Sequence, residues 1–124
     1  MPSRRQSAPL DSLATFEAPT REWFNSAFPG PTDAQAQGWP AIAAGEHTLI
    51  CAPTGSGKTL AAFLWCLDRL LTEKPPTDPV ARLRVLYVSP LKALVHDVDR
   101  NLRSPLAGIG LAAGRLGVEA RDVR

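Results

Sequence analysis

Residues 52–59 decide the fold, and their sequence is APTGSGKT. The stretch matches the phosphate-binding pattern Gly-x4-Gly-Lys-Ser/Thr except at its start, where Ala52 stands in place of the first glycine. Gly55 and Gly57 allow backbone conformations that bulkier residues resist, so successive N–H groups of the turn can point at a phosphate. The spacing therefore predicts a P-loop, a nucleotide-binding turn between a strand and a helix.

The end of this loop carries the residue types that ATP and Mg²⁺ require. Lys58 can reach the β- and γ-phosphates of ATP, and the Thr59 hydroxyl is placed to coordinate Mg²⁺. A helix that begins here adds its positive N-terminal end. A glycine-rich turn that binds nothing is the alternative, but Lys58 is one of only three lysines in the chain. The residues predicted to bind ATP are Pro53, Thr54, Gly55, Ser56, Gly57, Lys58 and Thr59.

Apolar segments around the loop predict a βαβ unit. The run at 48–52 fits a buried parallel strand, and a second strand is predicted at 83–88. The helix after the loop has apolar residues three and four positions apart, which favours packing against a sheet. A second amphipathic helix is predicted from residue 91 to a stop near Pro105, followed by a weakly helical stretch at 106–117. The pattern is typical of an α/β fold with a parallel sheet.

Two strands make an incomplete sheet. Both of its edges would be open, and residues 122–124 have the composition of the approach to a third strand. We therefore interpret the chain as part of a domain that is cut at its C-terminal end.

The segment before the loop is predicted to hold a tail and two short helices. Residues 1–18 are expected to form a disordered or weakly ordered tail, since their first half is rich in Ser, Pro and Arg. A helix is predicted at 20–28. Thr32 then has the position of an N-cap, with Gln35 completing a capping box, and the second helix should be interrupted by Pro40.

Composition restricts the class of protein only weakly. The net charge of +2 does not by itself indicate nucleic acid, and the excess of basic residues after residue 82 is compatible either with phosphate contacts or with an ordinary solvated surface. Cys51 and Cys66 lack the spacing of a zinc site, which favours reduced thiols. No apolar run is long enough for a membrane helix and no secretory signal is evident, so we expect a cytoplasmic protein.

Residues 28–35, FPGPTDAQ, resemble the Q-motif of superfamily 2 DEAD/DEAH-box helicases. In that family the Gln of the motif lies next to adenine, and its amide can both donate to a ring nitrogen and accept from the exocyclic amine. The resemblance implies this role for Gln35. The alternative is that Gln35 only completes the capping box, and both can hold.

Residues 89–94, SPLKAL, resemble motif Ia of the same family, which contacts the backbone of the bound nucleic-acid strand. A strand end that leads into a helix offers free N–H groups to a phosphate, and Lys92 could add a charge. An ordinary strand–helix junction is the alternative. The resemblance implies nucleic-acid contacts at Pro90, Leu91 and Lys92.

Further segments extend the resemblance to the large helicase-related (Lhr) group. It implies that residues 19–124 are the N-terminal part of the first RecA-like domain of an ATP-dependent translocase. Such an enzyme moves 3′ to 5′ on single-stranded DNA, unwinds duplexes or DNA–RNA hybrids, and serves DNA repair. The matching segments are Trp23-Phe24, Gly38-Trp39-Pro40, 47–50, 52–60 and 89–94.

The acidic box that hydrolyses ATP in this family is missing, because no two Asp/Glu residues are adjacent in the chain. Arg100 and Arg103 have no claim to the role of arginine finger, which in the family comes from a second RecA-like domain. We therefore expect the 124-residue chain to be inactive, and poorly folded or aggregation-prone. Two other functions remain open: a different P-loop enzyme, or a nucleic-acid-binding module with a degenerate loop.

Aromatic residues could stack on bases, but packing is the expected role of most of them. The exception is Phe16, which precedes Gln35 in the chain and is a candidate for stacking on adenine. The residues expected to pack are Trp23, Phe24, Phe28, Trp39 and Trp65.

Overall fold

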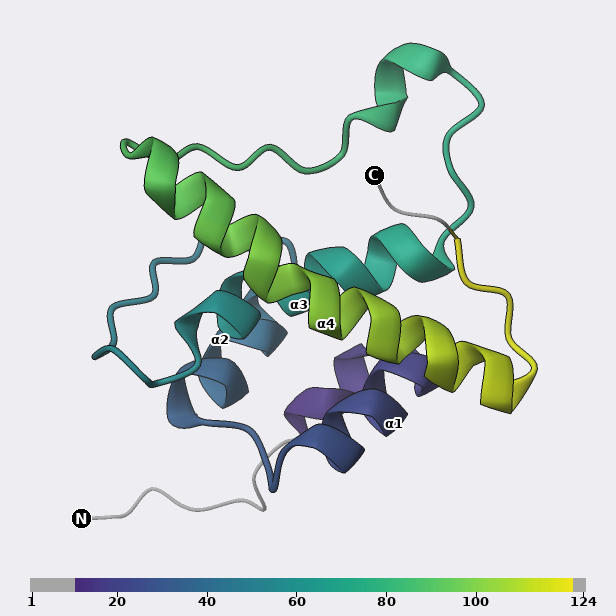
Figure 1. The fold of residues 1–124 in the computed structure, drawn as a ribbon, viewed down its shortest axis with the longest axis horizontal. Coiled ribbons are helices and arrows are strands. Elements are labelled where there is room, and N and C mark those ends of the chain that lie inside the picture. The colour runs from purple at the N-terminus through teal and green to yellow at the C-terminus, as the bar shows by residue number, and fades with distance from the viewer. Residues whose placement is uncertain (1–10, 122–124) are drawn as a thin grey trace.

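The computed structural model describes residues 11–121, and its regular structure is helical throughout this range (Figure 1). Helix α4 runs across the other helices, with its second half against α1, while α2 packs against α3. None of the helices in the described range is both long and apolar enough to span a membrane. The elements are η1 Ser12–Thr15, α1 Ala18–Ala27, α2 Asp33–Ala43, α3 Lys58–Thr72, η2 Pro79–Arg82 and α4 Lys92–Leu116.

Aromatic rings form the centre of the core. Phe24 of α1 and Trp39 of α2 are fully buried, and their rings meet edge to face with centroids 5.4 Å apart. Leu64 of α3 and Ile109 of α4 complete this cluster, so each of the four α-helices contributes to it. Packing was predicted for five aromatic residues. Trp23, Phe24 and Trp39 are buried, whereas Trp65 is half-buried and Phe28 is exposed.

Phe16 belongs to the same core, so the hypothesis that it stacks on adenine is wrong. Its side chain is only 2% exposed, and its ring lies 4.9 Å from that of Trp39. The preceding helix η1 is capped by the Asp11 carboxylate, which accepts from the Leu13 N–H at 3.1 Å. Residues 11–18 thus differ from the weakly ordered tail that we expected, and residues 1–10 lie outside the described range.

The capping box is confirmed, whereas both predicted proline stops are wrong. Helix α2 continues through Pro40 to Ala43, and α4 continues through Pro105 to Leu116. A proline inside a helix costs about 3 kcal/mol or more. Beyond Pro105, Ile109 and its neighbours are buried against α1, and this packing outweighs the penalty. The stretch at 106–117 is therefore fully helical up to Leu116.

The two predicted strands are extended connections without strand pairing, and no strand occurs among the described residues. A strand exists only when a neighbour satisfies its backbone, and within the described range neither segment has one. Their apolar side chains are exposed, with Leu49 at 88% and Leu86 at 75%. The parallel sheet is therefore not confirmed, and the apolar face of α3 packs against helices instead. The approach to a third strand at 122–124 lies outside the described residues.

Candidate nucleotide-binding site

The predicted P-loop has the backbone geometry that its glycines were expected to supply. Gly55 and Gly57 have φ values of 84° and 76°, in the left-handed region that favours glycine. The Ser56 N–H donates to the Pro53 carbonyl at 3.2 Å and closes the turn. Gly57 is also the N-cap of α3, and no side chain caps that helix. The first N–H groups of α3, which have no acceptor within the helix, are therefore available to an anion.

Lys58 and Thr59 are the first two residues of α3, as the motif requires. The Lys58 side chain is exposed, and Thr59 is half-buried. Among the described residues, Lys58 takes part in no ion pair, so its ammonium is free to meet a phosphate. The loop, the free helix end and the lysine together fit the triphosphate of a nucleotide. A hydroxyl at Thr59 fits the Mg²⁺ that accompanies it.

Gln35 links the capping box to the P-loop. Its Oε1 accepts from the Thr32 N–H at 3.1 Å, and its Nε2 donates to the Gly57 carbonyl at 3.2 Å. The side chain is 4% exposed. A Cβ atom at position 57 would press on the Gln35 amide and displace it from the Gly57 carbonyl, while the left-handed φ angle itself favours glycine there.

The two internal hydrogen bonds leave part of the Gln35 amide unused. A glutamine amide has two N–H donors and two acceptor lone pairs. One donor is taken by Gly57 and one lone pair by Thr32, so one of each remains. A flipped amide would set its NH₂ group against the Thr32 N–H, donor against donor. The amide is therefore held in one orientation, which fixes the positions of its unused donor and its unused acceptor.

Trp39 makes a second contact between α2 and α3, which the sequence did not reveal. Its indole Nε1 donates to the Leu60 carbonyl at 3.0 Å, and the side chain is fully buried. The signal in the sequence is the position of Trp39, four residues after Gln35 and hence on the same face of a helix. Packing was expected for this residue, and the hydrogen bond is additional.

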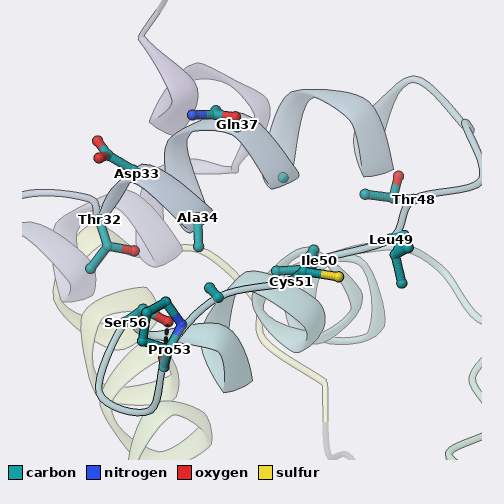
Figure 2. A pocket seen from close by; sticks show the side chains of 12 residues that line it. Thr32, Asp33, Ala34, Gln37, Thr48, Leu49, Ile50, Cys51, Pro53 and Ser56 are labelled. Atoms are coloured by element: carbon teal, nitrogen blue, oxygen red, sulfur yellow. Dashed lines mark hydrogen bonds between the residues drawn. The ribbon is translucent and has the colours of Figure 1, made fainter.

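A cavity of about 630 Å³ adjoins the loop. Figure 2 shows α2 on one side of it, the extended segment from Thr48 to Pro53 on the other, and Ser56 at the end of the loop. Lys58 and Thr59 are not among the residues that line it. The cavity therefore adjoins the first part of the predicted phosphate-binding loop, whose Pro53 and Ser56 line it, and includes neither Gln35 nor the Lys58–Thr59 pair.

The predicted nucleic-acid segment lies at the beginning of α4. Leu91 is the N-cap, without a side-chain hydrogen bond, and Lys92 is the first residue of the helix. The Ser89 Oγ accepts from the Leu91 N–H at 3.4 Å. Leu91 and Lys92 are exposed. An uncapped N-terminus beside an exposed lysine is compatible with a phosphate contact.

The remaining groups with possible chemical roles are metal ligands and cysteine thiols. No group of three or more His, Cys, Asp or Glu side chains in the described range could hold a metal ion. Cys51 and Cys66 are both free thiols, and burial raises the pKa of the Cys66 thiol above its ordinary value.

Comparison with known proteins identifies the family. The family model described as DEAD/DEAH box helicase matches residues 32–123. The chain is 58% identical over 113 residues to the "Lhr helicase/ probable uracil glycosylase" of Mycolicibacterium smegmatis, covering 91% of this chain and 7% of that protein. It is 51% identical over 113 residues to the "Lhr helicase/uracil glycosylase" of Escherichia coli, covering 88% and 7%. The "ATP-dependent helicase Lhr-Core" of Methanocaldococcus jannaschii is 41% identical over 109 residues, with 88% and 13% covered.

A solved structure gives the same result. It is described as the Mycobacterium smegmatis helicase Lhr bound to ssDNA and AMP-PNP, and it matches with a TM-score of 0.80 and 56% identity over 91% of this chain and 14% of that one. This chain therefore belongs to the DEAD/DEAH box helicases, and the predicted similarity to the Lhr group is confirmed. The similarity implies a RecA-like fold. The chain spans 7% of the length of the two bacterial relatives.

Proposed function

We propose that the protein acts as an ATP-dependent helicase or translocase on nucleic acid and that this chain carries its ATP-binding loop. The family supports helicase function, and its archaeal relatives are named ATP-dependent helicases. The observation that carries the ATP site is the left-handed pair Gly55 and Gly57 leading into the uncapped N-terminus of α3. In the proposed site the loop residues 53–57 surround the phosphates, Lys58 offsets their charge, and Thr59 holds Mg²⁺.

Gln35 is proposed to recognise adenine. The donor and acceptor left on its amide match the ring nitrogen and the exocyclic amine of adenine. Guanine presents a carbonyl where adenine presents the amine, so an amide held in this orientation would disfavour it. The contacts to Thr32 and Gly57 support this role because they hold the amide against rotation.

Pro90, Leu91 and Lys92 are proposed to contact the backbone of single-stranded DNA. The support is the exposed, uncapped N-terminus of α4 and the similarity to a protein described as bound to ssDNA. Movement from 3′ to 5′, action on duplex DNA or DNA–RNA hybrids, a role in DNA repair and a cytoplasmic location belong to the same proposal.

Hydrolysis is proposed to need residues that this chain does not contain. An acidic pair and the arginines of a second RecA-like domain would supply the steps after ATP binding. In the same proposal, partner strands convert the segments 48–52 and 83–88 into a parallel sheet. The 124-residue chain alone is therefore expected to bind ATP weakly and to hydrolyse none.

The test is the ATPase activity of the complete gene product, measured with and without single-stranded DNA. Lys58→Ala is expected to abolish activity, whereas Lys74→Ala, which changes a lysine after α3, should retain it. Stimulation by DNA separates a helicase from other P-loop enzymes. Hydrolysis that survives K58A, or that DNA does not change, would exclude the proposed function.

A further inference from the structure

Helix α2 contacts the first turn of α3 through two side chains from consecutive turns. Gln35 donates to the carbonyl of Gly57, and Trp39 donates to the carbonyl of Leu60. These carbonyls belong to the residues immediately before and after the Lys58–Thr59 pair. The two hydrogen bonds therefore bracket the residues proposed to hold the γ-phosphate and Mg²⁺.

The Trp39 contact has little freedom to move. The side chain is fully buried, and edge-to-face contacts with Phe16 and Phe24 fix its ring at centroid distances of 4.9 and 5.4 Å. A buried indole N–H needs an acceptor, and here the acceptor is a backbone atom of the P-loop helix. A displacement of α2 along α3 would break this bond and would also move Gln35 away from Gly57.

We propose that Trp39 is a positioning residue of the nucleotide site, which sets the distance between the adenine-binding amide of Gln35 and the phosphate-binding turn. This inference rests on the proposed function. ATP must contact both ends of the site at once, since its base and its triphosphate are covalently joined. The affinity for GTP depends less on the position of Gln35, because guanine presents a carbonyl where adenine presents the amine. Loss of the Trp39 hydrogen bond should therefore weaken ATP binding more than GTP binding.

The experiment compares W39F with wild type in the complete gene product, because phenylalanine keeps an aromatic ring and removes the donor. The dissociation constants of AMP-PNP and of a non-hydrolysable GTP analogue are measured together with KM and kcat for ATP. We expect the AMP-PNP dissociation constant and KM to rise about threefold to tenfold, the preference for ATP over GTP to fall, and kcat to stay within about twofold.

I109V is the matched control, since Ile109 is fully buried in the same core but lies on α4 and makes no side-chain hydrogen bond to α3. It should lower stability without changing the ATP preference. If W39F does not fold, Trp39 is replaced by 3-benzothienylalanine, which has the shape of tryptophan without the N–H donor. Unchanged affinity and preference in a folded variant, or equal changes in I109V, would overturn the inference. Those results would leave the proposed function intact as long as K58A still abolishes ATP hydrolysis.

Discussion

Apolar side chains are buried in the helical body but exposed in the two extended connections. In α1 and the second half of α4, apolar residues such as Phe24 and Ile109 are fully buried. In the segments 48–52 and 83–88, Leu49 and Leu86 are largely exposed although they belong to equally apolar runs. A helix satisfies its own backbone and needs only one packed face, whereas a strand needs a neighbour along its whole length. The P-loop connects one region to the other, between 48–52 and α3.

Substitution of the buried ring at position 24 should produce the largest effect. Phe24→Ala is expected to lower the free energy of unfolding by about 3–5 kcal/mol, since it opens a cavity among the rings of the core. In the 124-residue chain, Leu86→Ala lies in an exposed connection and should change the free energy of unfolding by less than about 0.5 kcal/mol. Urea unfolding followed by far-UV circular dichroism measures both. Similar losses for the two variants would mean that the connection is packed in solution.

A buried ion pair in the helical body should contribute more to the free energy of unfolding than an exposed ion pair on α4. Asp68 is fully buried, accepts from Glu17 N–H at 3.1 Å and from Thr20 Oγ1 at 2.6 Å, and pairs with Arg69. It thereby caps the N-terminus of α1 from another helix. Asp68→Asn should cost about 1–3 kcal/mol of unfolding free energy, because the amide keeps the shape but cannot accept all of these bonds.

The matched control is Asp99→Asn, which breaks the exposed pair with Arg103 and should cost less than about 1 kcal/mol. The same urea experiment measures it. An equal loss in both variants would contradict the distinction between the buried body and the exposed half of α4.

The thiols of Cys51 and Cys66 should differ in the rate at which they react with an added reagent. Cys51 lies in the exposed connection, whereas burial raises the pKa of Cys66 and so lowers its thiolate fraction at any pH below that pKa. In the 124-residue chain we expect Cys51 to react first with a maleimide at neutral pH, and the ratio of the two reaction rates to fall as the pH rises. Mass spectrometry of the time course measures this order. Equal rates at neutral pH would show that the body opens readily around α3.

Features set by local chemistry were predictable from the sequence. Gly55 and Gly57 adopt the conformations that the motif requires, and Thr32 with Gln35 forms the predicted capping box. Family membership was predictable from the same short segments, because each of them resembles a motif of the family.

Features set by contacts between distant parts of the chain were not predictable. Pro40 and Pro105 are tolerated inside helices because the turns around them are held by buried neighbours. Phe16 lies in the core although an aromatic residue upstream of Gln35 was a candidate for stacking on adenine. The role of Asp68 had one signal, a charged residue on the apolar face of α3, and its partners lie about fifty positions earlier in the chain.

Our central proposal is that the chain is a helical body carrying a P-loop, and that its two extended segments, 48–52 and 83–88, pair with strands from elsewhere in the protein. Amide hydrogen exchange, compared between the 124-residue chain and the complete gene product, tests it most directly. The sequence led us to expect a poorly folded chain, but the buried core shared by the four α-helices leads us to predict protection of α1 and α3 in both samples. We predict protection of 48–52 and 83–88 in the complete product alone. Rapid exchange of these two segments in the complete product, or of α1 and α3 in the 124-residue chain, would contradict the claim.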